Sequence, residues 1–238
     1  MKTNLTVATT DDRMFYLQRL LADVEFERDT HVYAPNILID SEKLAKVRDG
    51  GCVVCGKYEA GLQNAAKERG IDIFDMMKNE RFLAVNSRLT AEGALMLALE
   101  KLAISINDAR AMILGFGRMG AAVARLLNRF DTYLTVATGS SLRPAYAFAK
   151  SVTPLENFDF SQQDLIINTV PQPIVSDAEL LTMRTDAVYI DLASRPAINL
   201  DYAKYLGIDA DIYPALPAKV CPLAAANAIR AYISEVIK

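Results

Sequence analysis

The chain of 238 residues is long enough for one large domain or two small ones, and we expect two. Hydrophobic residues make up 52% and charged residues 23%, which excludes a disordered chain. A net charge of −3 argues against binding to nucleic acid, whose backbone attracts clustered lysine and arginine. Since the sequence contains neither a signal peptide nor an apolar run of the ~20 residues that span a membrane, we expect a cytoplasmic protein.

Three cysteines include Cys52 and Cys55, whose C-x-x-C spacing occurs in redox and zinc sites. Their segment is typical of a buried strand, in which residues three apart point to opposite faces. With only Cys221 and His31 as further soft ligands, a zinc site would need unusual partners. We therefore expect packed thiols and no metal site, with metal or redox chemistry as the less favoured alternative.

The first third of the sequence alternates short apolar segments with helical ones. Alternation of this kind predicts a parallel sheet. The expected strands are residues 5–8, 30–34, 52–55, 71–74 and 82–85, and the expected helices are 11–22 and 61–69. Residues 1–87 are therefore predicted to form a small, flavodoxin-like α/β domain.

The segment 90–102 is apolar nearly all round, which predicts a buried helix. Thr90 is placed to cap this helix and Glu92 lies near its expected positive end. We expect residues 88–107 to connect the first domain to a second α/β series. That series has predicted strands at 111–114, 133–137, 165–168 and 188–191 and helices at 119–129 and 144–150. It indicates a Rossmann domain over 108–222, followed by a C-terminal helix over 223–238.

A glycine-rich G-x-G-x-x-G turn follows the first strand of the second series and opens a helix. The order of strand, turn and helix makes this otherwise weak motif specific for dinucleotide binding. Gly115 permits the tight turn, Gly117 lets a pyrophosphate approach the backbone, and Gly120 lets helix and strand pack closely. The alternative is that the glycines only shorten the turn. The predicted cofactor-binding residues here are Gly115, Phe116, Gly117, Arg118, Met119 and Gly120.

The end of the next strand selects between NAD and NADP, because an acid there holds the ribose of NAD and repels the 2′-phosphate of NADP. No acid is present at this point of the sequence. Thr138 is followed by Ser140, Ser141 and Arg143, which offer hydroxyls and a guanidinium suited to a phosphate. We therefore expect NADP, with NAD as the alternative cofactor. The two serines could equally cap the next helix.

Several separate blocks follow one another in one order from Phe82 to the C-terminus. They are Asn86-Ser87, Thr90-Ala91-Glu92-Gly93, the glycine-rich turn, residues 167–171, residues 190–196, and Leu216-Pro217 before Pro222. In these blocks the chain resembles the dipicolinate synthase A subunit. That family consists of NAD(P)-dependent enzymes of the lysine and diaminopimelate pathway that make the spore compound dipicolinate. More widely, the chain is similar to D-2-hydroxyacid dehydrogenases and adenosylhomocysteinase, which have two α/β domains around a cleft.

The resemblance implies roles for these blocks. It places Asn168, Thr169, Val170, Pro171, Asp191 and Ala193 beside the cofactor, and Asn86, Ser87 and Thr90 on the substrate side. Arg195 could pair with a substrate carboxylate and Ser194 could orient it, although Arg195 could also form a structural ion pair. Glu92 is the acid available for proton transfer, with a charge at a helix start as the alternative.

The sequence also departs from the family. The N-terminal part is shorter and lacks a glycine-rich turn after Ala8, and Gly139 replaces a basic residue. The late segment 215–223 has alanine for a glycine and leucine for a lysine. We therefore expect a divergent NAD(P)-dependent oxidoreductase acting on a small carboxylated, dihydrodipicolinate-like substrate. The alternative is a non-catalytic NAD(P)-binding sensor or a component of a complex. We also expect a homo-oligomer, and the presence of a different, second subunit remains open.

Overall fold

The computed structural model describes residues 4–139 and 144–237 and divides the chain into two compact units. Unit 1 consists of residues 1–89 together with 217–238, and unit 2 consists of residues 90–216. The C-terminal helix therefore belongs to the first unit, whereas the sequence predicted a separate segment that follows the Rossmann domain in the chain. Each unit is an α/β structure with parallel strands, so the predicted fold class is confirmed.

Unit 1 contains a four-stranded parallel sheet with the order β1-β2-β4-β6. Its strands are β1 (Leu5–Val7), β2 (Thr30–Val32), β4 (Cys52–Cys55) and β6 (Asp72–Asp75). A second parallel pair is formed by β3 (Leu38–Ile39) and β5 (Lys57–Tyr58). The strands of the larger sheet follow one another in chain order, whereas flavodoxin has the order 2-1-3-4-5.

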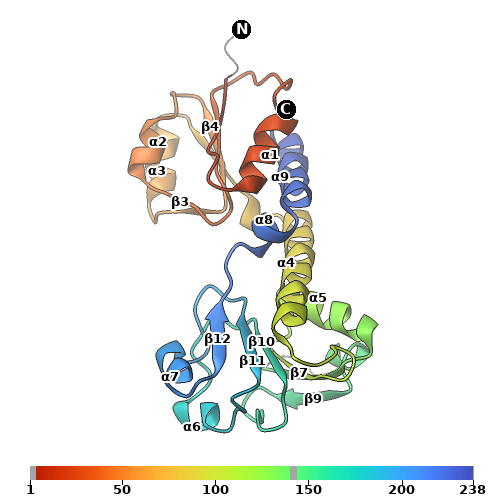
Figure 1. The fold of residues 1–238 in the computed structure, drawn as a ribbon. Coiled ribbons are helices and arrows are strands. Elements are labelled where there is room, and N and C mark those ends of the chain that lie inside the picture. Colours follow the sequence, from red (N-terminus) through yellow and green to blue (C-terminus); the bar gives the residue numbers. More distant parts are fainter. Residues whose placement is uncertain (1–3, 140–143, 238) are drawn as a thin grey trace. The chain divides into compact units, whose positions relative to one another are not determined.

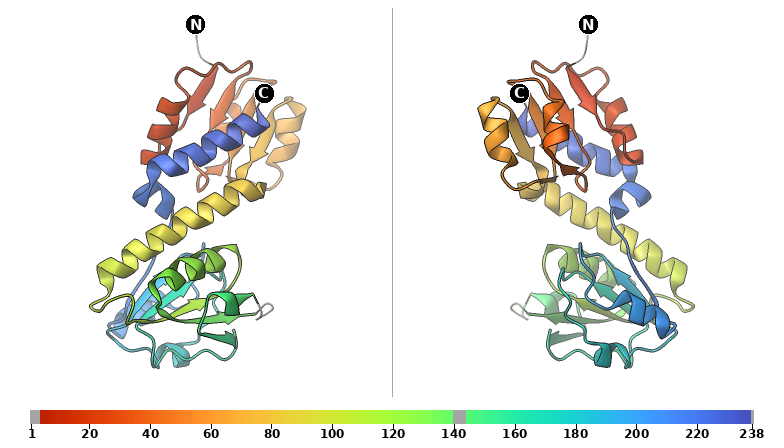
Figure 2. Two further views of the ribbon diagram at one scale, coloured as in Figure 1. Left: turned by 90° about the vertical axis from the view of Figure 1, so that its right-hand side faces the viewer. Right: turned by 90° about the vertical axis from the view of Figure 1, so that its left-hand side faces the viewer.

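Helices cover both faces of this sheet (Figure 1). On one face, α1 packs against α9, and their apolar side chains share a core with Val32 and Val54. On the other face, α2 and α3 bury a second core around Val53 and Cys55. The helices are α1 (Asp12–Leu20), α2 (Ser41–Ala45), α3 (Leu62–Glu68) and α9 (Pro222–Val236), with a 3₁₀ turn, η1, at Met76–Lys78. The views in Figure 2 show α9, coloured blue, beside the red α1.

The cysteines of β4 are buried and free, as the strand interpretation predicted. Cys55 lies with Val53 in the core under α2 and α3, so Cys52 points to the opposite face. The Cys52 sulfur is 3.4 Å from the hydroxyl oxygen of Thr30. Burial raises the pKa of the Cys55 thiol to about 12. Burial also raises the pKa of the Cys52 thiol, so both thiols are protonated packing groups near neutral pH.

Unit 2 contains a six-stranded parallel sheet with the order β12-β11-β10-β7-β8-β9. If the six strands are numbered 1 to 6 in chain order, from β7 to β12, the sheet read from β9 to β12 has the strand order 3-2-1-4-5-6 of the Rossmann fold. The four expected strands are confirmed. The edge strands β9 and β12 were not predicted, because polar residues and Pro154 interrupt the apolar runs that indicate a strand. The strands are β7 (Arg110–Leu114), β8 (Tyr133–Thr138), β9 (Ser151–Pro154), β10 (Leu165–Asn168), β11 (Val188–Asp191) and β12 (Asp209–Ile212).

The helices of unit 2 are short, apart from the one that follows the glycine-rich turn. The helix expected at 144–150 is wrong, since the described part of that segment contains only the 3₁₀ turn η3 (Ala145–Ala147). The remaining helices are α5 (Arg118–Leu127) with the 3₁₀ turn η2 (Asn128–Phe130), α6 (Asp177–Leu180) and α7 (Leu200–Tyr205). The short α8 (Leu216–Val220) begins at the last residue of unit 2.

The long helix α4 runs from Glu80 to Lys101, and the boundary between the units falls within it. Residues 82–85, predicted as a strand, are its first turns, because a short apolar run fits either structure. The side chain of Asn79 accepts a hydrogen bond from the Phe82 amide at 2.8 Å, so Asn79 caps the helix. Thr90 is consequently an interior residue, and the predicted capping role of Thr90 is wrong.

The expectation that this helix is buried all round is also wrong. Met96 is 43% exposed and Leu99 is 54% exposed, whereas Ala94 and Ala98 are fully buried. By length and hydropathy α4 could cross a membrane, but half of its apolar stretch is packed inside the protein. An apolar helix with one packed face is typical of a core helix.

The last residues of unit 2, Ala215 and Leu216, have a close contact and an unusual backbone conformation. A Cβ atom on Gly93 of α4 would lie 2.8 Å from the Cβ of Leu216, so only glycine permits this close approach. Ala215, the preceding residue, has φ of 57°, in the left-handed region that favours glycine. The backbone therefore stores strain at the residue before this contact.

Replacing Ala215 by glycine is expected to raise the free energy of unfolding by about 0.5–1 kcal/mol, because glycine relieves the left-handed strain. Ala218→Gly, inside helix α8, serves as the matched control and is expected to lower it by about 1 kcal/mol. Urea unfolding followed by circular dichroism measures both changes. Destabilisation by Ala215→Gly would contradict the strain.

Candidate functional site

Two glycines of the glycine-rich turn of unit 2 lie in close contact with neighbouring atoms. Gly115 has φ of 91°, and a Cβ there would lie 2.7 Å from the Thr169 hydroxyl oxygen and 2.8 Å from a methyl carbon of Val170. A Cβ on Gly120 would lie 2.1 Å from the carbonyl oxygen of Gly115. Gly115 requires glycine because its φ lies in the left-handed region and its neighbours leave no room for a Cβ. Gly120 requires glycine because real Cβ atoms do not approach a backbone oxygen so closely. The predicted roles of these two glycines in turn and packing agree with this geometry.

Gly117 differs from the other two glycines because space remains around it. A Cβ at this position meets no atom of the described residues within 4 Å, and its φ of −75° is an ordinary value. Gly117 is exposed and is the N-cap of α5, so it offers no side chain to the first turn of that helix. The N-terminus of a ten-residue helix carries positive partial charge, which favours an anion.

The turn lies where the strand order of the sheet reverses. β7 pairs with β10 on one side and β8 on the other, and the chain leaves β7 at Gly115 and β10 at Thr169. The Thr169 hydroxyl donates a hydrogen bond to the Leu114 carbonyl at 2.9 Å. Ligands of open α/β sheets bind in the crevice outside the carboxyl ends of the strands at this reversal. The structure therefore brings the turn and the predicted segment 168–171 together.

A buried carboxylate, Asp191, connects the ends of β10 and β11. Both of its oxygens accept from the Asn168 side-chain amide, at 3.0 and 2.9 Å. The Tyr189 hydroxyl and the Ala193 amide each donate to Asp191 at 2.9 Å, and the Ala197 amide donates at 3.1 Å. Four donor groups thus satisfy one carboxylate that is fully buried.

Burial and hydrogen bonding act in opposite directions on this carboxylate. Desolvation raises the pKa of Asp191, while the backbone and side-chain donors lower it by a smaller amount. Burial next to Asp191 also raises the pKa of Tyr189, so its hydroxyl stays protonated and remains a donor. The buried Asn168 side chain also forms hydrogen bonds with the loop after its strand. It accepts from the Val170 amide at 2.9 Å and donates to the Val170 carbonyl at 3.0 Å.

Asn168 and Asp191 therefore act on the loops after their strands. Both side chains are 0% exposed, and their hydrogen bonds hold the backbone at Val170 and Ala193 from the buried side of the loops. Sequence analysis did not identify Tyr189 as part of this group. The signal that could have found it is the i, i+2 spacing of Tyr189 and Asp191, which places both on one face of β11.

The other predicted cofactor residues are placed as follows. Phe116 is half-buried, with its ring centroid 6.5 Å from that of Phe148, while Arg118 is exposed and Met119 half-buried on α5. Thr138 is buried at the end of β8. The predicted phosphate-reading residues Ser140, Ser141 and Arg143 lie outside the described residues.

The predicted substrate-side residues lie on α4, but they do not form one group. At 100° per residue, Asn86, Ser87 and Thr90 share one side of the helix and Glu92 lies on the opposite side. Ser87 is 5% exposed and Thr90 6% exposed, whereas Glu92 is exposed. The expected placement of Glu92 near the positive end of a helix is wrong, because the helix starts at Glu80.

Ser194 and Arg195 lie in the loop that follows β11, shortly after Asp191. Both residues are exposed. Arg195 forms no ion pair with a carboxylate of residues 4–139 or 144–237, so the alternative of a structural ion pair finds no support in the structure. The Arg195 guanidinium therefore has donors available to an external anion.

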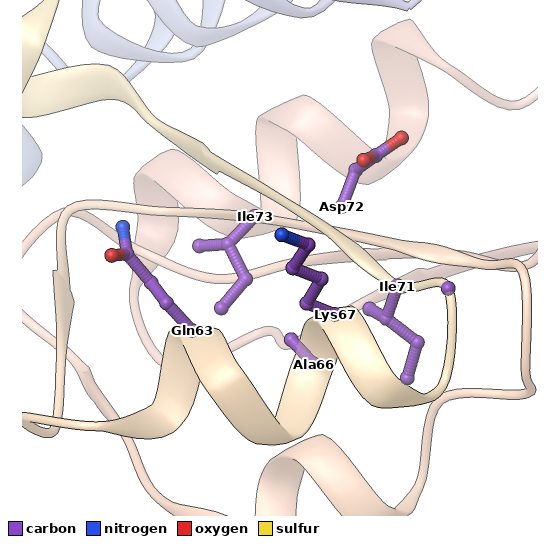
Figure 3. A pocket seen from close by; sticks show the side chains of 7 residues that line it. Gln63, Ala66, Lys67, Ile71, Asp72 and Ile73 are labelled. Atoms are coloured by element: carbon purple, nitrogen blue, oxygen red, sulfur yellow. The ribbon is translucent and has the colours of Figure 1, made fainter.

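Unit 1 contains a shallow hollow of about 220 Å³ between α3 and β6. Figure 3 shows Gln63 and Lys67 of α3 beside Ile71, Asp72 and Ile73. The Asp72 carboxylate already pairs with the Arg28 guanidinium. No group of three His, Cys, Asp or Glu side chains with metal-site geometry occurs among the described residues. The candidate site is therefore the carboxyl edge of the unit 2 sheet.

The fold is of the two-domain Rossmann type, and comparison with known proteins confirms the resemblance inferred from the sequence. The chain is 28% identical over 192 residues to the dipicolinate synthase A subunit of Bacillus subtilis, a match that spans 78% of this chain and 65% of that protein. No family model matches the chain.

Solved structures show the same fold. The crystal structure of the dipicolinate synthase A subunit from Bacillus halodurans matches with a TM-score of 0.85 and 22% identity, covering 99% of this chain and 98% of that chain. A D-isomer-specific 2-hydroxyacid dehydrogenase from Lactobacillus delbrueckii, in an NAD-complexed form, matches with a TM-score of 0.61 and 11% identity over 97% of this chain and 94% of that chain.

Asp191→Asn is expected to lower the free energy of unfolding by about 3 kcal/mol, because the new amide nitrogen would face buried donors. Tyr189→Phe removes a single donor and is expected to cost about 1 kcal/mol. Chemical unfolding of the two variants and the parent protein measures the difference. Equal losses in both variants would show that the carboxylate is not the centre of the network.

Proposed function

We propose that the chain is an NAD(P)-dependent oxidoreductase that transfers hydride between a nicotinamide cofactor and a small carboxylated substrate of the dihydrodipicolinate type. The observation that carries the proposal is the glycine-rich turn at the strand-order reversal of unit 2, with open space around Gly117. The similarity to the dipicolinate synthase A subunit supports the same activity.

The residues of the turn fit a dinucleotide. The space at Gly117 and the N-terminus of α5 would receive the pyrophosphate, and Thr169, Val170 and Pro171 would lie beside it at the end of β10. When bound, the nicotinamide accepts or donates the hydride. In the oxidative direction a hydride and a proton leave the substrate, and both return in the reductive direction. The protein's contribution is to orient the reactants and exclude water.

For the cofactor we propose NADP, with NAD as an accepted alternative. The support comes from the end of β8, where Thr138 and Gly139 are followed by serines and Arg143 in place of an acid. An acid there would repel a 2′-phosphate, whereas hydroxyls and a guanidinium attract it.

For the substrate we propose that Arg195 binds a carboxylate and that Ser194 donates a hydrogen bond to it. Both side chains are exposed in the loop anchored by Asp191. Asn86, Ser87 and Thr90 remain substrate-side candidates on the strength of the resemblance alone. Glu92 lies on the other side of α4 from these three, so we assign proton transfer to a hydroxyl or to water.

The second candidate function is a non-catalytic NAD(P)-binding sensor or a component of a complex. The observation that favours it is the altered late segment 215–223, with an alanine where the family has glycine and a leucine where the family has lysine. A turn that binds nucleotide beside an altered substrate loop would suit such a protein. Turnover of a dihydrodipicolinate-like substrate by the purified chain alone would exclude it. The proposed oxidoreductase is cytoplasmic and forms a homo-oligomer, with assembly with a different, second subunit as the alternative.

Gly117→Ala is expected to weaken nucleotide binding at least tenfold, because a methyl group would occupy the space where the pyrophosphate meets the backbone. The unliganded variant should keep its melting temperature, since the new Cβ meets no described atom within 4 Å. Calorimetric titration with NADPH and NADH gives both affinities and their ratio. If the parent protein binds neither nucleotide, the oxidoreductase proposal fails.

Arg195→Gln is expected to raise KM for a carboxylated substrate about 10- to 100-fold, since a charge-assisted hydrogen bond contributes about 1.5–3 kcal/mol. NADPH affinity should stay within twofold of the parent value, because the proposed pyrophosphate contacts come from the glycine-rich turn. Arg184→Gln, which removes two ion pairs of an exposed arginine, one with Asp164 and one with Asp186, is the control. An unchanged KM would remove Arg195 from the substrate site.

A further inference from the structure

A buried arginine in unit 1 keeps a hydrogen-bond donor that no described residue accepts. Arg13, in the first turn of α1, is only 3% exposed. Its Nη2 donates to the Asp11 carboxylate at 2.8 Å and to the Asn36 side-chain oxygen at 2.9 Å. Its Nε is buried and has no partner in residues 4–139 or 144–237. Burying a guanidinium is costly unless its donors are satisfied, so an acceptor from outside the chain would be favourable here.

This arginine lies at a crevice of the unit 1 sheet. The neighbouring strands β1 and β2 are parallel, but α1 follows β1 on one face, and α2, the next helix after β2, lies on the other (Figure 1). Connections that leave adjacent strands toward opposite faces separate at the carboxyl ends, where open α/β sheets bind their ligands. Arg13 follows β1 and Asn36 follows β2, so the hydrogen bond between them crosses this crevice.

Asn36 occupies the position that a ligand oxygen would take. Its side chain is exposed whereas that of Arg13 is buried, so Asn36 can turn toward solvent without unpacking the core. The backbone beneath it is held in place, because a Cβ on Gly56 would lie 2.4 Å from the carbonyl oxygen of Pro35. A hydrogen bond from arginine to a carboxylate is about twice as strong as one between neutral groups. A carboxylate can therefore replace the Asn36 amide oxygen on the guanidinium.

The charges at this crevice favour a singly charged ligand. Asp11 is the N-cap of α1, and its second oxygen accepts from the Met14 amide at 3.1 Å, so it stays in place when a ligand binds. The ion pair of Asp11 and Arg13 is neutral. The N-terminus of the nine-residue α1 adds only partial positive charge. This balance suits a carboxylate better than a doubly charged phosphate.

We propose that Arg13 binds the carboxylate of a small organic acid in unit 1. The ligand displaces the Asn36 side chain and accepts hydrogen bonds from Nε and from the Nη2 hydrogen that Asn36 releases. Asp11 remains paired with the same guanidinium. All of these groups belong to unit 1, so the site does not depend on the nucleotide site proposed for unit 2.

Picolinate is the probe for this site, and its uncharged amide, picolinamide, is the matched control. Calorimetry should show binding of the acid and at least tenfold weaker binding of the amide. In isotope-labelled protein, the Arg13 Nε–H resonance, assigned by its absence from Arg13→Lys, should shift on addition of picolinate. Both titrations are repeated in Arg195→Gln, so that the carboxylate contact proposed for unit 2 does not contribute. No binding, or binding that leaves the Arg13 resonance unmoved, would overturn the proposal.

Substitutions of Asn36 test the site while leaving the buried arginine intact. Asn36→Ala removes the competing amide and should strengthen picolinate binding at least threefold. Asn36→Asp places a carboxylate of the chain itself on the guanidinium, so it should weaken picolinate binding at least tenfold and raise the melting temperature. Asn64→Asp, at an exposed position on α3, is the control and should leave picolinate binding unchanged.

These variants separate a ligand site from a purely structural arginine. A structural role for Arg13 predicts that Asn36→Ala lowers stability without any gain in binding. Unchanged or weaker binding in Asn36→Ala, or retained binding in Asn36→Asp, would therefore overturn the proposal. Circular dichroism confirms that each variant is folded. NADPH titration of the same samples reports on the function proposed for unit 2, and its outcome leaves the result for Arg13 unaffected.

Discussion

The contact between Gly120 and the carbonyl of Gly115 determines the arrangement of unit 2. A Cβ at Gly120 would stand 2.1 Å from that oxygen, so α5 can follow β7 this closely only without a side chain. The approach brings the start of α5 to the point where β7 and β10 separate. The open space at Gly117 and the helix N-terminus beside it follow from the same turn. The candidate binding site is therefore a consequence of backbone packing.

The loops that border this site depend on a second constraint, the fully buried Asp191 carboxylate. A buried acid is costly unless its oxygens are satisfied, and here one amide side chain, one hydroxyl and two backbone amides satisfy them. Because the donors come from β10, β11 and the following loop, the carboxylate fixes these segments to one another. The exposed loop that carries Arg195 is consequently anchored at both Ala193 and Ala197.

Helix α4 combines features that belong to different parts of the protein. Its first turns form the core of unit 1 through Phe82 and one wall of an apolar groove beside α9. Further along, Gly93 permits the close approach of Leu216, and Lys101 pairs with Asp209 of β12 at 2.8 Å. On the outer face of the helix, Met96 and Leu99 are exposed beside the charged Glu92. One face of the helix is therefore packed, with Ala94 and Ala98 fully buried, and the other face is exposed.

The sequence by itself determined the glycine-rich turn and the four inner strands of unit 2, because these depend on local spacing and short buried runs. It could not determine the edge strands β9 and β12 or the start of α4 ten residues before Thr90. Those depend on which segments become neighbours. The tertiary structure also placed Glu92 away from Ser87 and Thr90 and brought α9 against α1. Helix phase and pairing between distant segments are set by burial, which local sequence patterns do not specify.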